Sequence, residues 1–128
     1  MNVVEQKVKL NYTYTTKNCN VHSCTLIIDF NPEAQAPIIF QNLIIYLPYN
    51  YTTINASIPG LKYNAIYNKS NFYTKFRFYN SSTNVYGPLI EYFYPRTNYV
   101  NTGTNYVNIA SYILYPNKNL DIILNMSN

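Results

Sequence analysis

The chain has 128 residues, a length typical of one domain with enough interior for a hydrophobic core. Hydrophobic residues make up 48% of it, which excludes intrinsic disorder, and charged residues only 11%. The net charge of +4 comes from scattered Lys and Arg residues, which excludes a basic nucleic-acid-binding tail. Because no apolar run is long enough to span a membrane, and Glu5 and Lys7 interrupt the start, neither a membrane span nor a signal peptide is predicted.

Uncharged polar residues dominate the composition. Asn occurs 21 times and Tyr 16 times, whereas Gly occurs only 3 times. A surface built from uncharged amides and hydroxyls does not change its charge when the pH falls, whereas carboxylates become protonated near pH 4. The composition therefore predicts an exposed and acidic setting. An AT-rich genome would also favour Asn and Tyr, but it leaves the low content of charged residues unexplained.

The first segment alternates with a period of two. Its apolar positions share one parity: Val4, Val8, Leu10, Tyr12 and Tyr14. Glu5, Lys7 and Lys9 share the other parity. Alternate residues of a strand point to opposite faces, so residues 3–14 are predicted to form a half-buried strand. The polar stretch 15–23 is expected to be a loop.

The remaining chain continues as short apolar segments separated by turn signals. Strands are predicted at residues 24–30, 38–47, 51–58, 61–67, 72–79, 85–94, 97–100, 106–115 and 120–126. A short helix beginning at Pro37 is the alternative for the second of these, but Ile is β-branched and disfavours helix. Turn signals every 8 to 12 residues are typical of an all-β sandwich or barrel. We predict one antiparallel β-sandwich over residues 1–128, with about eight to ten strands and a jelly-roll-like connectivity.

Two cysteines, Cys19 and Cys24, lie close together around the single histidine, His22. A zinc site could use all three side chains, but structural zinc takes four ligands and the chain has no further Cys or His. A disulfide that closes a short loop is favoured, and would indicate an oxidising compartment or a hyperthermophilic source. Two free buried thiols are the third interpretation. No metal and no cofactor is predicted.

The residues that usually carry catalysis are sparse and separated. The five acids lie in different segments, and none is expected to form a close pair: Glu5, Asp29, Glu33, Glu91 and Asp121. No serine is surrounded by a nucleophile-elbow pattern, and no glycine-rich phosphate loop occurs. We therefore predict that the protein is not an enzyme.

Residues 72–79 combine aromatic and basic side chains that separate onto two faces. Phe72, Thr74, Phe76 and Phe78 share the parity expected to enter the core. The other parity forms a possible partner-facing strand: Tyr73, Lys75, Arg77 and Tyr79. Such a face could stack nucleic-acid bases, but the glycines of the RNA-recognition aromatic motif are missing, so nucleic acid is not the favoured partner. Cross-strand packing of tyrosines with basic side-chain stems is the simpler interpretation.

The abundant tyrosines exceed what a small core can hold. Tyrosine is enriched where proteins meet proteins, and interface cores are depleted of charge. These two features predict a subunit that contacts neighbouring subunits. Six sequons also occur, which makes six asparagines possible glycosylation sites: Asn11, Asn50, Asn55, Asn68, Asn80 and Asn125.

In composition and strand rhythm the whole chain resembles virion proteins of viruses that infect hyperthermophilic, acidophilic archaea, namely jelly-roll capsid, turret and tail components. The resemblance implies a virion structural subunit, assembled in the host cytoplasm, with copies of itself and other virion proteins as partners. Either terminal strand, residues 3–14 or 120–126, could pair with an exposed strand of a neighbour. A carbohydrate-binding β-sandwich that attaches to host-surface glycans is the alternative, as is a subunit of an archaeal surface filament at the cell surface.

Overall fold

The computed structural model describes residues 12–32, 37–68, 73–93 and 105–128, and within these ranges the chain is all β. The described ranges form eleven strands: β1 Tyr12–Lys17, β2 Ser23–Phe30, β3 Ile38–Phe40, β4 Leu43–Tyr46, β5 Thr53–Ser57, β6 Lys62–Asn68, β7 Tyr73–Tyr79, β8 Tyr86–Phe93, β9 Tyr106–Ala110, β10 Tyr112–Leu114 and β11 Leu120–Ser127. All strand pairs are antiparallel. The predicted strand at residues 97–100 lies outside the described residues.

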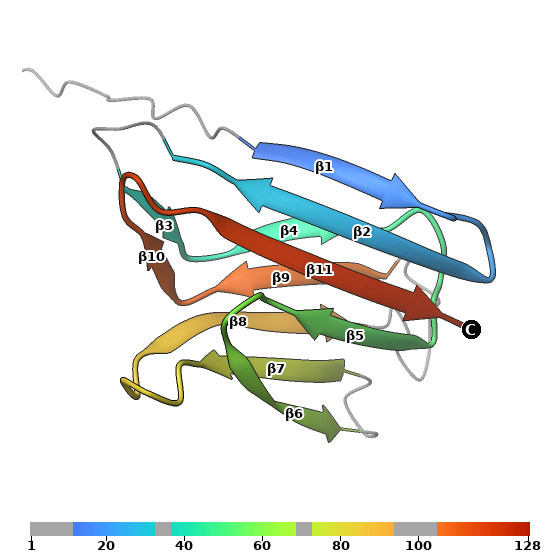
Figure 1. Ribbon diagram of the computed structural model, residues 1–128. Coiled ribbons are helices and arrows are strands. Elements are labelled where there is room, and N and C mark those ends of the chain that lie inside the picture. The colour runs from blue at the N-terminus through green and yellow to red at the C-terminus, as the bar shows by residue number, and fades with distance from the viewer. Residues whose placement is uncertain (1–11, 33–36, 69–72, 94–104) are drawn as a thin grey trace, which may run out of the picture.

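Two sheets pack face to face and confirm the predicted β-sandwich (Figure 1). One sheet has four strands in the order β1-β2-β11-β5, and the other has five in the order β4-β9-β8-β7-β6. A small sheet of β10 and β3 lies at one end of the sandwich (Figure 1). The jelly-roll connectivity is not confirmed. Strands β6 to β9 follow one another across their sheet as a meander, whereas a jelly roll is built from two Greek keys.

The core lies between the two sheets because each strand sends alternate residues inward. In β11, for example, the buried residues are every second one: Leu120, Ile122, Leu124 and Met126. In β7, Phe76 and Phe78 are buried, as predicted from their parity. Burying apolar side chains of this size stabilises the fold by about 1.5–3 kcal/mol each.

Two predicted strands are each broken in the middle. The segment 38–47 divides into β3 and β4 around Gln41, and the segment 106–115 divides into β9 and β10 at Ser111, whose φ is 57°. Few residues other than glycine adopt this left-handed conformation, so an extended strand cannot continue through it. The ladders β3–β10 and β4–β9 keep one common register across the break, so the two strands bend together.

The first strand differs from its prediction. β1 continues to Lys17, where a loop was expected, because its backbone pairs with β2 as far as Lys17 opposite Thr25. Tyr14 was expected on a buried face, but its side chain is 65% exposed. β1 is an edge strand that extends the four-stranded sheet past the core. The predicted strand before Tyr12 lies outside the described residues.

A bulge in β8 shapes the outer face of the five-stranded sheet. Arg77 lies opposite Leu89, but Tyr79 lies opposite Tyr86, so β8 holds the extra residue. A bulge of this kind accommodates the buried Pro88, which cannot donate a ladder hydrogen bond. Gly87 also fits here for steric reasons, since a Cβ atom would lie 2.7 Å from Leu61 Cδ1.

Candidate interaction surface

Four aromatic side chains cross the outer face of the five-stranded sheet in one line, which we call the aromatic row. It consists of Tyr73 on β7, Phe93 on β8, Tyr106 on β9 and Tyr46 on β4, paired in register. Neighbouring ring centroids are 6.0, 5.0 and 6.1 Å apart, and the central pair is stacked. The row ends at Tyr46, whose side chain is 70% exposed. Ring pairs at these distances stabilise a sheet beyond their buried area.

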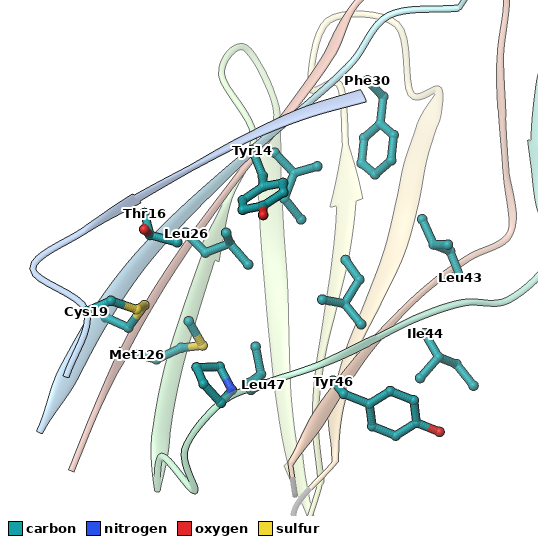
Figure 2. Close-up of a pocket in the computed structure, with 14 residues that line it drawn as sticks. Tyr14, Thr16, Cys19, Leu26, Phe30, Leu43, Ile44, Tyr46, Leu47 and Met126 are labelled. Atoms are coloured by element: carbon teal, nitrogen blue, oxygen red, sulfur yellow. A yellow bond between two sulfur atoms is a disulfide. The ribbon is translucent and has the colours of Figure 1, made fainter. Parts of the chain in front are cut away.

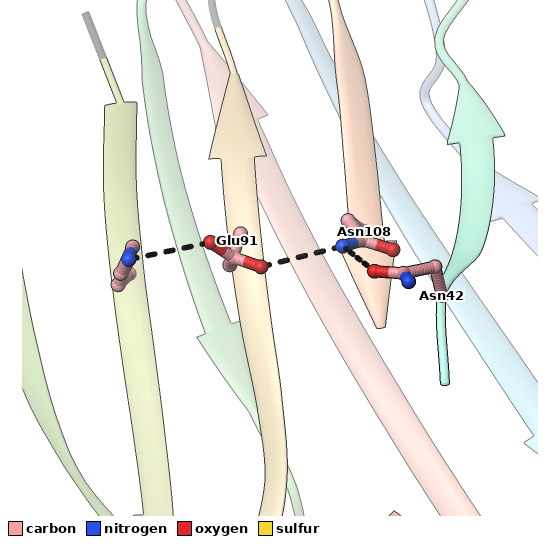
Figure 3. A network of polar contacts seen from close by, with 4 residues as sticks. Asn42, Glu91 and Asn108 are labelled. Atoms are coloured by element: carbon pink, nitrogen blue, oxygen red, sulfur yellow. Dashed lines mark hydrogen bonds and ion pairs between the residues drawn. The ribbon is translucent and has the colours of Figure 1, made fainter. Parts of the chain in front are cut away.

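A polar row runs parallel to the aromatic row, one pair of residues further along the strands. The Lys75 ammonium lies 3.5 Å from Glu91 Oε2, and Asn108 Nδ2 donates to Glu91 Oε1 at 3.3 Å and to Asn42 Oδ1 at 2.9 Å (Figure 3). Asn108 is buried, and the Glu91 side chain is 14% exposed. The carboxylate of Glu91 thus joins β7 to β9 across β8.

Replacement of Glu91 by Gln is expected to destabilise the fold by about 1 kcal/mol, because it removes the charge that pairs with Lys75 at a partly screened position. Urea unfolding followed by circular dichroism measures this loss. Lys62→Gln, at an exposed lysine at the start of β6, is the control and should change stability by less than about 0.5 kcal/mol. Equal unfolding midpoints for Glu91→Gln and the unmodified protein would contradict the assigned role.

The predicted partner-facing strand lies on this surface. Tyr73, Lys75, Arg77 and Tyr79 occupy the outer side of β7, with Arg77 the most exposed of the four. Both cations stand over tyrosine rings: Lys75 Nζ is 4.9 Å from the centroid of Tyr73, and Arg77 Cζ is 4.9 Å from that of Tyr86. Phe72 lies outside the described residues. The basic groups therefore make contacts within the chain rather than projecting freely.

Sequence reasoning missed the other members of this surface. Phe93, Tyr106, Tyr46 and Tyr86 come from other strands, and no pattern in one strand indicates which residue of another lies opposite it. The available signal was the alternation within each strand, which places each of these residues on one face but does not align it with a neighbour.

A second feature is an apolar cleft at the open side of the sandwich, between β1 and β2 on one sheet and β4 on the other (Figure 2). Its volume is about 520 Å³. The walls include Leu26, Leu43, Ile45, Leu47 and Met126. The cleft is therefore lined mainly by aliphatic side chains that belong to the edge of the core.

The cysteine loop lies at one end of this cleft. Cys19 and Cys24 are joined by a disulfide, so neither sulfur is free to bind zinc. The Asn20 side-chain oxygen accepts hydrogen bonds from the backbone N–H groups of His22 and Ser23. The Asn128 backbone N–H donates to the His22 carbonyl at 2.9 Å, which ties the loop to the end of β11. Across the described ranges, no three His, Cys, Asp or Glu side chains are grouped as metal ligands would be.

Two acids that were predicted to be isolated form a close pair. Asp29 on β2 lies directly opposite Asp121 on β11, so the two carboxyl groups are neighbours on one face of the sheet. Burial, the hydrogen bond to Asp29 and the charge of Asp29 raise the pKa of Asp121 above its usual range. The Asp29 Oδ1 atom is buried without a hydrogen-bond partner. The expectation of no close acid pair was wrong because the two strands are far apart in sequence and only their pairing brings them together.

The described sequon asparagines lie in loops, on the edge strands β5 and β6 and, for Asn125, on the inner strand β11. Asn50, Asn55 and Asn125 are exposed and Asn80 is half-buried, while Asn11 lies outside the described residues and Asn68 ends β6. Two of the exposed side chains accept hydrogen bonds from neighbouring hydroxyls: Asn55 from Tyr63, and Asn125 from Thr25. Glycosylation of the six sites stays a prediction.

No family model matches the chain, and neither the curated proteins nor the solved structures give a match. The resemblance to archaeal virion proteins stays a prediction, as does the absence of enzymatic activity. In the described part of the chain, no helix is long and apolar enough to cross a membrane.

Proposed function

We propose that the protein is a structural subunit of a virion, as a capsid, turret, spike or tail component, and that it assembles with copies of itself through the outer face of the five-stranded sheet. The observation that carries the proposal is the aromatic row together with the exposed apolar side chains beside it. Ile66 on β6 and Tyr86 on β8 are 55% and 63% exposed, and Ile44 on β4 is 47% exposed. Exposed apolar patches with aromatic residues are typical of protein contact sites.

The charges on this face support contact with a copy of the same chain. Lys75 is paired with Glu91, and Arg77 stands over the ring of Tyr86. Both basic groups of β7 therefore already have a contact within their own chain when two such faces meet. A symmetric dimer contact pairs the same patch from both subunits, and the contacts of Lys75 and Arg77 within the chain limit the repulsion between these basic groups there. The disulfide supports a location in oxidising surroundings, such as the surface of a virion or of a cell.

Carbohydrate binding for host attachment is the second candidate. The exposed ring of Tyr46 at the end of the aromatic row, with the amide of Asn42 near the same edge strand, could stack against a sugar and hydrogen-bond it. Nucleic acid is not favoured, because Lys75 is paired with Glu91 and would have to leave that carboxylate to contact phosphate.

Light scattering on the intact protein at neutral and acid pH tests the proposal. A multimer is expected, and Ile66→Asn with Tyr86→Asn should lower its molar mass because both changes make the contact face polar. Tyr115→Asn is the matched control, since Tyr115 is 62% exposed but lies outside this face. A monomer at both pH values would overturn the proposal. A glycan array would then test attachment, with Tyr46→Asn expected to lose the signal.

A further inference from the structure

The four edge strands of the two main sheets differ sharply in how they are protected. β1, β5 and β6 carry Thr, Asn, Ser or Lys side chains among their apolar residues. β4 has the sequence Leu-Ile-Ile-Tyr, with no charge and no proline. Edge strands of soluble proteins are often protected by lysines, such as Lys17 of β1 and Lys62 of β6, because an open edge pairs with other chains. β4 is hydrogen-bonded to β9 on one side, and no described strand pairs with its other side.

The cleft adjoins this open edge. All four residues of β4 line it, as do Tyr14 and Thr16 of β1 on the opposite sheet (Figure 2). A strand added beside β4 would place every second side chain in the cleft and its other side chains in solvent. The volume of about 520 Å³ leaves room for several aliphatic side chains there. The site therefore fits an extended segment with apolar residues on one side.

The chain itself contains such a segment directly before β1. Val4, Val8 and Leu10 share one parity, interrupted only by Gln6, and Glu5, Lys7 and Lys9 share the other. Eleven residues in extended form reach about 36 Å, which is well over the length of the four-residue strand β4. Only Asn11 separates Leu10 from Tyr12, where β1 begins beside the cleft, and this is shorter than the two-residue loop of the tightest common hairpins. A reversal into the cleft of the same chain is therefore disfavoured, and a neighbouring subunit is the better acceptor.

We infer that the open edge of β4 and the cleft beneath it accept residues 1–11 of a second copy of this chain as an added strand. Val4, Val8 and Leu10 of the donor enter the cleft, and the charged residues between them face solvent. Backbone hydrogen bonds to β4 provide affinity, and the alternating side chains set the register. The inference rests on the proposed assembly and names a contact at the β4 edge of the same sheet, where Ile44 and Tyr46 belong both to the contact face and to the cleft.

The test uses the intact chain. Val8→Asn with Leu10→Asn makes the donor side polar, and Lys7→Asn with Lys9→Asn is the matched control on the other side. Light scattering should give a lower molar mass for the first variant than for the unmodified protein. The control should have the same molar mass as the unmodified protein. A fluorescent peptide of residues 1–11 should bind the first variant, and adding Ile44→Lys to the β4 edge should weaken that binding at least tenfold.

The outcomes separate this inference from the proposed function. A multimer that dissociates on changing Ile66 and Tyr86 but not on changing Val8 and Leu10 would overturn the inference alone. Failure of the peptide to bind would also overturn it. A monomeric unmodified protein would overturn the proposed function. The unmodified protein could be a monomer while the Val8→Asn, Leu10→Asn variant binds the peptide. Residues 1–11 would then occupy the cleft of their own chain, and the inference of a second copy would be overturned as well.

Discussion

Replacing Asp121 with Asn is expected to stabilise the protein at neutral pH and to remove part of its dependence on pH. Asp121 and Asp29 are paired directly opposite each other on neighbouring strands. Like charges in this position destabilise a sheet by up to about 1 kcal/mol, and the exposure of Asp121 to solvent limits the effect to that range. An Asn side chain removes one charge and can donate a hydrogen bond to the Asp29 carboxylate.

The direction of the pH dependence follows from the raised pKa of Asp121. A carboxyl group whose pKa is higher in the folded than in the unfolded state binds its proton more tightly when folded. Its contribution to stability is complete below the unfolded pKa and is lost as the pH rises through the folded pKa. The pair therefore favours the folded state in acid, which agrees with the acidic setting predicted from the composition.

Urea unfolding between pH 3 and pH 7 measures this effect. The unmodified protein should lose the contribution of this pair as the pH rises from about 4, and Asp121→Asn should show a flatter profile. Asp29→Asn tests the same pair from the other strand and should flatten the profile in the same direction. If both variants followed the profile of the unmodified protein, the Asp29 carboxyl group would not be what raises the pKa of Asp121.

Alternation within single strands predicted the β-sandwich and the two faces of β7. Phe76 and Phe78 are buried and Arg77 is exposed, because side-chain direction in a strand follows from position alone. The break at Ser111 was not predictable in this way. Serine is not a strong signal for a positive φ, and the conformation arises where β9 and β10 bend together with β3 and β4.

The contacts between strands required the register of the whole sheet. Glu91 meets Lys75 and Asn108, and Asp29 meets Asp121, only because separate strands pair in one particular register. Register depends on the fit of all inward-facing residues at once, so one strand does not reveal it. The candidate surface was therefore predicted for its β7 part, and its Phe93, Tyr106 and Tyr46 parts emerged only from the fold.

A buried polar cluster provides the substitution with the largest expected loss of stability. Tyr51, Tyr92 and Asn105 are at most 1% exposed. Asn105 Nδ2 donates to the Tyr51 carbonyl at 2.6 Å and contacts the Tyr92 hydroxyl, which donates to the same carbonyl. The Tyr51 hydroxyl in turn donates to the Asn20 carbonyl at 2.7 Å, so the cluster links the core to the cysteine loop.

Asn105→Asp keeps the shape of this side chain but replaces its donor by a carboxylate facing the Tyr51 carbonyl. Asn105 Oδ1 already lacks a hydrogen-bond partner, so the new charge would be buried without compensation. A buried charge without a partner costs about 3–5 kcal/mol at neutral pH, a large fraction of the stability of a domain of this size. Protonation should restore part of the loss in acid, since a neutral carboxyl can donate a hydrogen bond to the carbonyl.

Urea unfolding at pH 7 and pH 3 measures both parts of this prediction. Asn119→Asp, at an exposed position before β11, adds the same charge at the surface and should change stability by less than about 0.5 kcal/mol. A loss for Asn105→Asp no larger than that of the surface control would show that the cluster is open to water. A loss of equal size at both pH values would instead assign the effect to packing rather than to charge.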